Sequence, residues 1–588
     1  MAHDIESFKQ ELKAAGGKCK VDLILENIRL VDVYTSEIRP ASLAIFNGRI
    51  VALDPASDFQ AFQRIDGNGM FAVPGFIDTH MHIETTLLTP EALAEAITPW
   101  GTTSLFVDAM EIANVAGKDG LSALIKDSDR LPFRIYLEIP SRVPTAPGLE
   151  TTGGTIGVDE TKDLFKLEET VSLGELDPAK VLEYKDEYLE KILSAYEARR
   201  ICNGHAIGLT PEELNVYATG HLSDDHETVT YDELLNRLRV GIPTLIREGS
   251  SERNVEELIR GIIEHNLPTD NLMFCTDDKH VNDIFREGHI SYNIQKSIQM
   301  GLDPIEAIKM ATIHAARHFH LEHQIGSLTP GRFADIVLLP DLKEIKPALV
   351  LKGGKIVSQN GKPIPVKMKD YPAFLFDTVK LKSEITSDRF RIQADGKQAL
   401  CRVIQLIPDQ IINRETQDWL PIVNGQIDPQ IDRDILKLAV VERYGKNGRV
   451  SVALVQGFML KRGALASSVS HDHHNIVTVG TNDSDMAMAV REIAKMKGGF
   501  VACSGGKIIG KLELPLAGLM SVLPAHDVMQ QMNDLNNAAR SLGVEMAAPF
   551  MTLSFISLPT VPQLGLTDYG LIDVLGHRLT DLIIEVEN

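Results

Sequence analysis

Predicted strands and helices alternate through the centre of this 588-residue chain. Apolar runs such as Gly101–Asp108 and Leu272–Asp277 are typical of buried strands. They alternate with helical segments that begin with a capping residue before a proline, as at Thr89-Pro90, or extend further, as expected from Ala179 to Arg199. Repeated βα units favour a parallel sheet covered by helices. We therefore predict an α/β fold with a (β/α)8 barrel over residues 76–327, whose reactive side chains gather at the carboxyl ends of the strands.

Two strand-rich segments flank this central region. In residues 1–75, Asn47-Gly48 stands between two apolar runs, which is a strong signal for a β-hairpin. In residues 328–380 a related pattern returns at Ala334–Leu339 and Val350–Val357. We expect both segments to form one small β domain, a β-sandwich. The pattern also admits two unrelated β pieces.

The pattern of predicted strands and helices changes again after Leu381. Val452–Gln456 and Asn475–Gly480 read as strands, and Ser484–Lys497 reads as a helix. Residues 381–588 therefore predict a separate α+β domain. At the other end of the chain, Met1–Lys20 is typical of a short charged helix and lacks the apolar core of a signal peptide.

Composition excludes several classes of protein. The formal net charge of -22 argues against binding to a phosphate backbone, although it leaves room for a single nucleobase as a small substrate. No stretch reaches the roughly 18 apolar residues that a membrane span needs. The five cysteines show no paired spacing of the CxxC kind. We predict a soluble cytoplasmic protein without disulfides, bound to neither nucleic acid nor membrane.

Two histidines one residue apart follow the apolar run that contains Phe76-Ile77. If His80 and His82 lie on a strand, the period of two places both imidazoles on one face. Such a pair at a strand end suits a transition metal. A bare pair is more often a half-exposed strand. The acidic neighbours Asp78 and Glu84, together with polar residues at later strand ends, favour a metal site here.

The later strand ends supply further ligand types, namely Glu175, His205, His226 and Asp277. Each of these residues alone would more often be structural. As an ordered set with His80 and His82, they can hold two divalent ions that share a carboxylate. Two ions roughly 3.5–4 Å apart generate a hydroxide at neutral pH and polarise an electrophile. Nitrogen and oxygen ligands admit manganese, iron or zinc.

Longer motifs around these residues carry a family resemblance. The sequence resembles the amidohydrolase superfamily at Pro74–Glu84, at Thr276-Asp277 and at Leu328–Val337. More narrowly it resembles the bacterial adenine deaminase family, in the motifs Asp108–Val115, Gly204-His205, Asp225–Thr228, Ile246–Ser250, Cys275–Asp278 and Ser470–Ile476. The resemblance spans nearly the whole chain, including the C-terminal region that most amidohydrolases lack.

The resemblance implies hydrolysis of adenine to hypoxanthine and ammonia, a purine salvage reaction on a small-molecule purine base. It implies two divalent ions, Mn²⁺ before Fe²⁺ or Zn²⁺, and a homodimer or higher homo-oligomer. The implied metal ligands are His80, His82, Glu175, His205, His226 and Asp277, with Glu175 bridging. His221 competes with His226 for one position, but the Asp-His-Glu-Thr context favours His226.

The resemblance also implies a mechanism. A hydroxide that bridges the metals attacks C6 of adenine, and Asp277 takes its proton. A carboxylic acid protonates the adjacent ring nitrogen, and Glu84, Glu111 and then Glu248 qualify by position. Each of the three would serve equally well as an orienting group behind the ligands.

Four residues are expected to bind substrate: Asp278, Met110, Arg247 and His471. Asp278 would hold a purine nitrogen, and its alternative is an exposed loop carboxylate. Arg247 either touches the substrate or pairs with a local carboxylate. Met110 departs from the family pattern, because Asp-Pro-His-Glu is replaced by Asp108-Ala-Met-Glu111. A thioether fills apolar space but cannot donate or accept as imidazole does. The change is therefore either silent or adapted to a purine with a bulkier N6 group.

A second histidine cluster lies in the C-terminal region at His471–His474. Its spacing would suit another metal site or a structural loop, and we expect a lip that closes over the barrel mouth. Two rival functions remain beside adenine deamination. One is an amidohydrolase that acts on another cyclic amide or amidine, and the other is a vestigial barrel that serves as a binding or scaffold protein.

Overall fold

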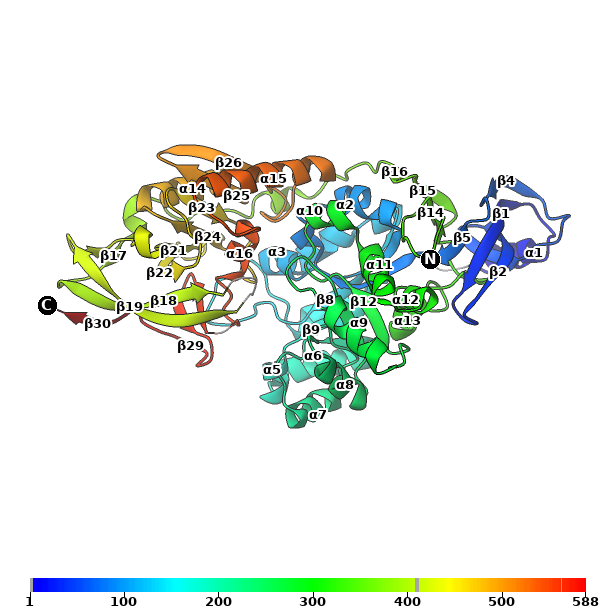
Figure 1. Cartoon of the computed structure of the whole chain (residues 1–588), viewed down its shortest axis with the longest axis horizontal. Helices are drawn as coiled ribbons and strands as arrows, with labels where there is room; N and C mark the ends of the chain where they lie inside the picture. The colour runs from blue at the N-terminus through cyan, green and yellow to red at the C-terminus, as the bar shows by residue number, and fades with distance from the viewer. Residues whose placement is uncertain (1–3, 408–411, 562, 588) are drawn as a thin grey trace.

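The computed structural model describes residues 4–407, 412–561 and 563–587 (Figure 1). Along its long axis, a strand-rich N-terminal region lies at one end, a region of mixed helices and strands lies in the middle, and the C-terminal region lies at the other end.

The middle region is built on parallel strands. Five of them form one sheet in the order β10-β9-β8-β7-β6, and β11 and β12 form a parallel pair. Their bounds are β6 Phe76–Met81, β7 Thr102–Asp108, β8 Arg134–Pro140, β9 Thr170–Leu176, β10 Ile201–Gly204, β11 Thr244–Arg247 and β12 Leu272–Cys275.

Backbone hydrogen bonds connect the five-stranded sheet to the pair. The amide of Ser223 donates to the carbonyl of Cys202 in β10 (2.8 Å), and the amide of Leu245 in β11 donates to that of Asp225 (2.9 Å). On the other side, the amide of Asp277, just beyond β12, donates to His80 in β6 (3.0 Å). The parallel strands and the short segment at Ser223–Asp225 therefore form a hydrogen-bonded ring.

Helices pack around these strands in Figure 1. They are α2 Pro90–Ile97, α3 Met110–Ile125, α4 Val158–Leu164, α5 Pro178–Leu182, α6 Asp186–Glu197, α7 Pro211–Thr219, α8 Tyr231–Arg239, α9 Val255–Glu264, α10 Val281–Glu287, α11 Ile290–Met300, α12 Pro304–Met310 and α13 Ile313–His318.

The single helix expected from Ala179 to Arg199 is wrong, because two helices occupy this stretch. α5 ends at Leu182 and α6 begins at Asp186. Between them Tyr184 has a positive φ of 55°, which a continuous helix cannot contain.

A nine-stranded sheet combines strands from both sides of the middle region. Its order is β16-β15-β14-β13-β5-β1-β2-β3, with β4 beside β1, and Val73 of β5 pairs with Val337 of β13. Asn47 and Gly48 both have positive φ in the β2–β3 hairpin, which confirms the predicted turn. The bounds are β1 Val21–Asp32, β2 Glu37–Phe46, β3 Arg49–Leu53, β4 Ala61–Asp66, β5 Phe71–Pro74, β13 Ile336–Leu339, β14 Leu349–Lys352, β15 Lys355–Gln359 and β16 Lys362–Pro363.

Helix α1 (Ile5–Ala15) precedes this sheet. It lies within the short helix predicted for Met1–Lys20, of which the first three residues are outside the described part. Asp4 caps the helix by accepting a hydrogen bond from the amide of Ser7 (2.7 Å). Ala14 is buried against the sheet with Val21 and Ile24.

The C-terminal region has an eleven-stranded sheet in the order β17-β20-β19-β18-β22-β21-β24-β23-β25-β26, with β30 beside β18. A separate three-stranded sheet contains β27–β29. The strand bounds are β17 Ile392–Gln393, β18 Gln398–Leu406, β19 Asn413–Val423, β20 Gln426–Ile427, β21 Ile435–Val441, β22 Val450–Gln456, β23 Ala464–Ser467, β24 Ile476–Gly480, β25 Gly499–Ser504, β26 Lys507–Glu513, β27 Leu564–Thr567, β28 Gly570–Asp573, β29 Arg578–Leu579 and β30 Ile583–Glu587.

In the described part of this region, three α-helices accompany these sheets: α14 Asp483–Met496, α15 Ala525–Ser541 and α16 Pro549–Phe555. The expected helix at Ser484–Lys497 is confirmed by α14, and the two expected strands coincide with β22 and β24. α14 buries Met486 and Ile493 against the sheet.

The C-terminal region shares an apolar core with the middle region. Leu87, Leu88, Leu516 and Met520 belong to one cluster of buried side chains, and the amide of Ser521 donates to Leu87 (2.9 Å). This contact places the C-terminal region next to the segment that follows β6. The five cysteines are unpaired. In the described residues, every helix is too short or too polar to cross a membrane.

Candidate metal centre

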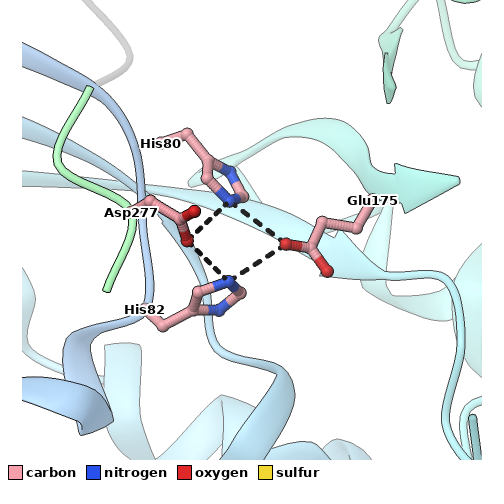
Figure 2. Close-up of side chains that lie close together, drawn as sticks. All are labelled: His80, His82, Glu175 and Asp277. Carbon is pink, nitrogen blue, oxygen red and sulfur yellow. Dashed lines mark hydrogen bonds and ion pairs between the residues drawn. The ribbon is translucent and has the colours of Figure 1, made fainter. Parts of the chain in front are cut away.

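Four buried side chains converge at the carboxyl ends of the parallel strands (Figure 2). His80 lies near the end of β6, His82 follows the strand, Glu175 comes from β9, and Asp277 follows β12. Glu175 Oε1 lies 3.3 Å from His80 Nε2 and 3.0 Å from His82 Nε2. Asp277 Oδ1 lies 3.5 Å from His82 Nε2. One ligand atom from each of the four residues lies within 4.8 Å of the others, close enough to bind one ion.

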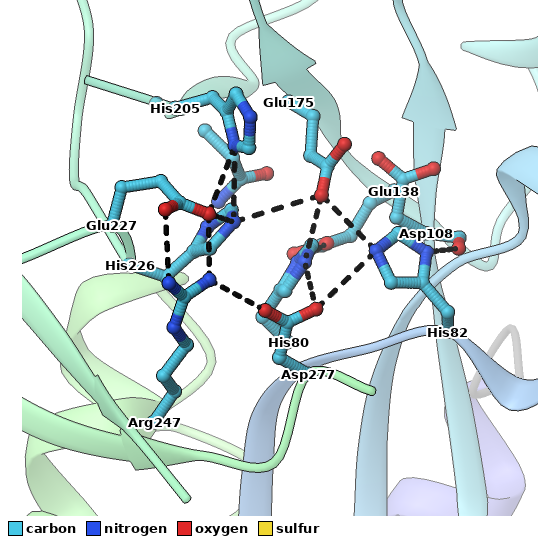
Figure 3. A network of polar contacts seen from close by, with 12 residues as sticks. His80, His82, Asp108, Glu138, Glu175, His205, His226, Glu227, Arg247 and Asp277 are labelled. Carbon is cyan, nitrogen blue, oxygen red and sulfur yellow. Dashed lines mark hydrogen bonds and ion pairs between the residues drawn. The ribbon is translucent and has the colours of Figure 1, made fainter. Parts of the chain in front are cut away.

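A second group shares Glu175 with the first. His205 follows β10 and His226 follows the bridged residue Asp225. His226 Nε2 lies 3.6 Å from Glu175 Oε1, and the ligand atoms of His205, His226 and Glu175 meet the same 4.8 Å limit (Figure 3). The structure therefore brings all six sequence-predicted ligands together around one carboxylate. His221 is exposed and packs on Tyr196 instead (ring centroids 5.2 Å apart).

Hydrogen-bond acceptors at Nδ1 orient the rings of His80 and His82. His80 Nδ1 lies 2.7 Å from Glu138 Oε2, and His82 Nδ1 lies 2.8 Å from the carbonyl oxygen of Asp108. Acceptors at Nδ1 place the ring protons there and leave each Nε2 lone pair facing the cluster. Nε2 of His80 is buried and has no hydrogen-bond partner among the described residues. This donor set and this orphaned nitrogen fit a bound divalent ion.

Both carboxylates of the first group stand on unusual backbone. Glu175 has φ 29° and Asp277 has φ 54°, in the left-handed region that residues other than glycine rarely adopt. Each such residue costs about 1–3 kcal/mol and persists only where its surroundings hold it. The bends turn the two carboxylates toward the histidines.

Charged neighbours act on these carboxylates. Burial opposes ionisation of Glu175, yet Arg142 and His82 hold its pKa well below the ordinary value. Burial likewise opposes ionisation of Asp277, and Arg247 and His226 lower its pKa. Both groups are therefore ionised at neutral pH, as metal ligands must be.

Arg247 contacts carboxylates. Its Nη1 lies 2.9 Å from Asp277 Oδ2 and 2.6 Å from Glu227 Oε1, while Nε donates to Asn254. Of the two interpretations of Arg247 from sequence, the structure displays the pairing with local carboxylates (Figure 3). Asp277 Oδ1 remains turned toward His80 and His82.

The three candidate acids differ in their surroundings. Glu84 Oε1 accepts the amide of Ile112 (2.9 Å), and burial followed by the charge of Glu111 raises its pKa well above the ordinary value. Glu111 lies between His82 Nδ1 (3.6 Å) and His471 Nδ1 (3.4 Å); burial opposes its ionisation, but both histidines lower its pKa. Glu248 is bound to Lys296 Nζ (2.8 Å) and the amide of Val255, and the structure does not bring it into the cluster.

A small pocket beside the cluster lies between the middle and C-terminal regions. Its lining residues are Thr85, Leu87, Asp278, His280, Val469, His471, Phe500, Met551, Ser554 and Phe555. Burial, and next the charge of Asp277, raise the pKa of Asp278 to about 7. The ring of His471 stacks on Phe555 with centroids 4.6 Å apart. Met110 is buried at the start of α3, outside this set of lining residues.

The other histidines of the C-terminal cluster are held by their own loop. The amide of Asn475 donates to His473 Nδ1 (3.0 Å), and the amide of Ser470 donates to His474 Nδ1 (3.2 Å). Glu111, His471 and His474 have the spacing of a metal site. However, a neutral imidazole that accepts at Nδ1 carries its proton on Nε2, which cannot then bind a metal. The arrangement therefore favours a hydrogen-bonded loop over a second metal site.

Sequence reasoning missed Glu138, Glu227 and Arg142. Glu227 adjoins His226 in the Asp225–Thr228 motif, and its carboxylate forms a further metal-capable group with His226 and Asp277. Glu138 lies near the end of a buried strand, which was a usable signal. Arg142 lies in a loop, and nothing in the local sequence marks it.

Comparison with known proteins agrees with this geometry. Residues 71–357 match the Amidohydrolase family, and residues 410–578 match the Adenine deaminase C-terminal domain. The ring of strands and the buried cluster both lie within the first match. The protein thus has a (β/α)8-type amidohydrolase fold with extra domains, in a family of metal-dependent hydrolases.

Full-length relatives narrow the family. An adenine deaminase from Desulforamulus reducens is 59% identical over 588 residues, which is 100% of both chains. An adenine deaminase from Dehalococcoides mccartyi is 36% identical over 97% of this chain and 99% of its own. The chain therefore belongs to the adenine deaminase family. Among solved structures, a zinc-bound adenosine deaminase from Xanthomonas campestris is 15% identical with a TM-score of 0.43, over 59% of this chain and 95% of that one, which is too weak a likeness to bear on the fold.

Proposed function

We propose that this protein hydrolyses adenine to hypoxanthine and ammonia. The supporting observation is the convergence of six metal-ligand side chains, with Glu175 shared between the two sets, in a chain that is 59% identical along its full length to an adenine deaminase. A scaffold protein without catalysis would gain nothing from two strained carboxylates and four buried or half-buried imidazoles in one place.

The proposed metal ligands fall into two overlapping sets. His80, His82, Glu175 and Asp277 hold one divalent ion, and Glu175, His205 and His226 hold the other. When bound, the two ions activate water at neutral pH and polarise the purine. We favour Mn²⁺, with Fe²⁺ and Zn²⁺ as the alternatives, because the set contains imidazole and carboxylate and no thiolate.

Asp277 is the proposed base that takes a proton during attack at C6. Arg247 binds its Oδ2, so Oδ1 alone is directed at the cluster. Arg247 thus orients Asp277, and a role in direct contact with substrate gives way to this positioning role.

Glu84 and Glu111 are proposed to share one proton. Both are buried, and the charge of Glu111 raises the pKa of Glu84. Two neighbouring carboxyl groups of this kind avoid double ionisation. Glu111 also touches His471, whose ring lines the pocket, so the shared proton has a short route toward the ring nitrogen of adenine.

Asp278 and His471 are the proposed groups that hold the purine. Both line the pocket, where Phe555 supplies an apolar ring face. A carboxyl group with a pKa of about 7 can either donate to or accept from a purine nitrogen. His471 reaches this pocket from the C-terminal region, which supports the lip over the barrel mouth.

The domain division is proposed as follows. Residues 76–327 form the closed (β/α)8 barrel, which the hydrogen-bonded ring supports. Residues 1–75 and 328–380 form the small β-sandwich, supported by one apolar core that contains Leu25 and Leu43 together with Ile336 and Leu351. Residues 381–588 form the α+β domain. The unpaired cysteines suit the reducing cytoplasm, and the homodimer or higher oligomer rests on the family resemblance.

The proposed activity is tested directly. Manganese-loaded protein is incubated with adenine, N6-methyladenine, adenosine and cytosine, and released ammonia or methylamine is measured, with His80→Ala as the blank. We expect turnover of adenine well above the other three. Preference for N6-methyladenine would support the alternative that Met110 suggests. If the metal-loaded protein releases no ammonia or methylamine from any of the four compounds, adenine deamination is excluded and another amidohydrolase reaction is left.

A further inference from the structure

Arg142 occupies one oxygen of Glu175. Its Nε donates to Glu175 Oε2 (3.1 Å), and its Nη2 makes a second, shorter contact to the same atom. Glu175 Oε1 faces the opposite way, toward His80, His82 and His226. A guanidinium donates through fixed, planar N–H groups and is always charged, so it holds Oε2 in one direction.

This contact leaves the two carboxylate oxygens of Glu175 in different surroundings. Here Oε2 is turned away from the histidines and satisfied by Arg142. Oε1 alone remains within reach of both ligand groups.

Arg142 also contacts the C-terminal region. Its Nη1 lies 3.9 Å from Oδ2 of Asp472, which adjoins the pocket residue His471. Asp472 is 3% exposed, and its Oδ2 has no hydrogen-bond partner among the residues that the structure describes. The charge contact with Arg142 therefore offsets part of the cost of burying this carboxylate oxygen.

The loop that carries Arg142, residues 141–157, is held at its start and again around Thr151. At its start, Ser141 Oγ donates to the carbonyl of Glu175 (2.8 Å), and Lys191 Nζ donates to the carbonyl of Ser141 (3.0 Å). These bonds tie the loop to β9 and α6.

Further along, the loop is held by the C-terminal region. The amide and the hydroxyl of Thr151 donate to the two carboxylate oxygens of Asp568 (2.9 and 2.7 Å). Asn475 Nδ2 donates to the carbonyl of Thr151 (2.9 Å), and Lys446 Nζ donates to that of Thr152 (2.7 Å). The C-terminal region therefore sets the path of a loop whose first residues touch the metal cluster.

We propose that Arg142 is a positioning residue through which the C-terminal region holds Glu175 with Oε1 turned toward both groups of metal-ligand side chains. The inference rests on the metal centre of the proposed function. It also accounts for the backbone at Glu175, where φ of 29° needs support from outside the strand. The competing interpretation is that Arg142 only links the two regions, without effect on the metals.

The test compares Arg142→Gln, Arg142→Lys and Asp472→Asn with the native protein. Arg130→Gln is the matched control, because Arg130 also pairs with a buried carboxylate, that of Glu91, outside the cluster. Metal content is measured after dialysis against a chelator series, and the coupling between two bound Mn²⁺ ions is followed by electron paramagnetic resonance.

We expect Arg142→Gln to weaken metal retention about 10–100-fold and to change the spectrum of the coupled pair, as loss of a partner behind a ligand typically does. Arg142→Lys keeps the positive charge but lacks the planar guanidinium with its paired donors. Its metal retention should therefore lie between those of Arg142→Gln and the native protein. Asp472→Asn should shift retention and spectrum in the same direction by a smaller factor. Arg130→Gln should match the native protein.

Unchanged retention and spectrum in Arg142→Gln would overturn the proposal. If that variant fails to fold, Arg142→Lys decides the role of Arg142 in the same way, and native behaviour of Asp472→Asn overturns the link to the C-terminal region. The metal readouts need no substrate. A native protein that binds two ions but ignores adenine would therefore refute the proposed function while leaving this inference intact.

Discussion

His82 Nε2 lies 3.0 Å from Glu175 Oε1, although 93 residues separate them in the chain. The contact joins β6 to β9, two strands that do not pair with each other. It exists because parallel strands end on the same side of the fold, so their last side chains meet. His205 and His226 approach the same carboxylate, that of Glu175, from later positions in the ring of strands.

Glu175→Gln should abolish the activity. The amide keeps the shape of the side chain but loses the charge that both metal sets share. We expect loss of metal and a fall in adenine turnover of more than about 100-fold, because even partners behind a ligand contribute about 10–100-fold. Glu183→Gln, at an exposed position directly after α5, is the control. Metal analysis and an ammonia assay measure both, and full metal content in Glu175→Gln would contradict the assignment.

His226→Ala and His221→Ala form a matched pair. Both remove an imidazole from the segment before β11, but His226 is buried in the cluster and His221 is exposed. We expect His226→Ala to lose one metal per chain and nearly all activity, while His221→Ala keeps both within about 2-fold, as surface substitutions usually do. The reverse result in the same assays would exchange their roles.

Residue chemistry made much of the site predictable. Histidine and acidic side chains at strand ends are few, and their order along βα units indicates a shared face. Local periodicity likewise predicted α14 and the hairpin at Asn47-Gly48. These features depend on neighbours in sequence, or on a regular fold that places strand ends together.

Features that depend on irregular loops were not predictable. Arg142 acts on Glu175 from 33 residues away through a loop without a motif. No glycine or proline in the sequence marks the helix break at Tyr184. Lysines on both sides of the break, Lys180 and Lys191, donate to carbonyls of Thr145 and Ser141 in the loop that carries Arg142. Glu248 qualified as the general acid by its sequence position alone, but in the folded chain its carboxylate accepts a hydrogen bond from Lys296.

His471→Gln tests the lip. Glutamine can replace one hydrogen bond but neither the stack on Phe555 nor the contact with Glu111. We expect KM for adenine to rise about 10-fold or more, since a hydrogen bond to a charged group contributes about 1.5–3 kcal/mol. Metal content should stay native. The exposed His577→Gln is the control, and an unchanged KM in His471→Gln would place substrate elsewhere.

Glu150 should make stability depend on pH. Burial raises the pKa of this carboxyl to about 7, against an ordinary value of 4.5, although the amide of Ala146 donates to it (2.7 Å). Between these values the folded state binds a proton that the unfolded state has released. Stability from this group is therefore full below about pH 4.5 and is lost as pH rises to about 7, by on the order of 3 kcal/mol.

The measurement for Glu150 is the thermal unfolding midpoint at pH 5 and pH 8. We expect Glu150→Gln to be close to native at pH 5 and more stable than native at pH 8, because the amide never ionises. Glu183→Gln removes the same charge at the surface and corrects for the overall charge of the chain. An equal difference between Glu150→Gln and native at both pH values would show that Glu150 does not titrate in this range.

Met110→His tests the departure from the family pattern. Met110 is 3% exposed in an apolar core and lies outside the set of pocket-lining residues. A buried imidazole without a partner should lower stability by about 1–3 kcal/mol. The ratio of kcat/KM for adenine to that for N6-methyladenine should stay within about 3-fold of native, which corresponds to less than about 0.7 kcal/mol of differential binding. Met110→Leu, which conserves volume without adding a polar group, is the control.

The opposite outcome is a shift of this kcat/KM ratio beyond about 10-fold in Met110→His but not in Met110→Leu. That result would make position 110 a determinant of substrate choice, acting through the start of α3 and its neighbour Glu111.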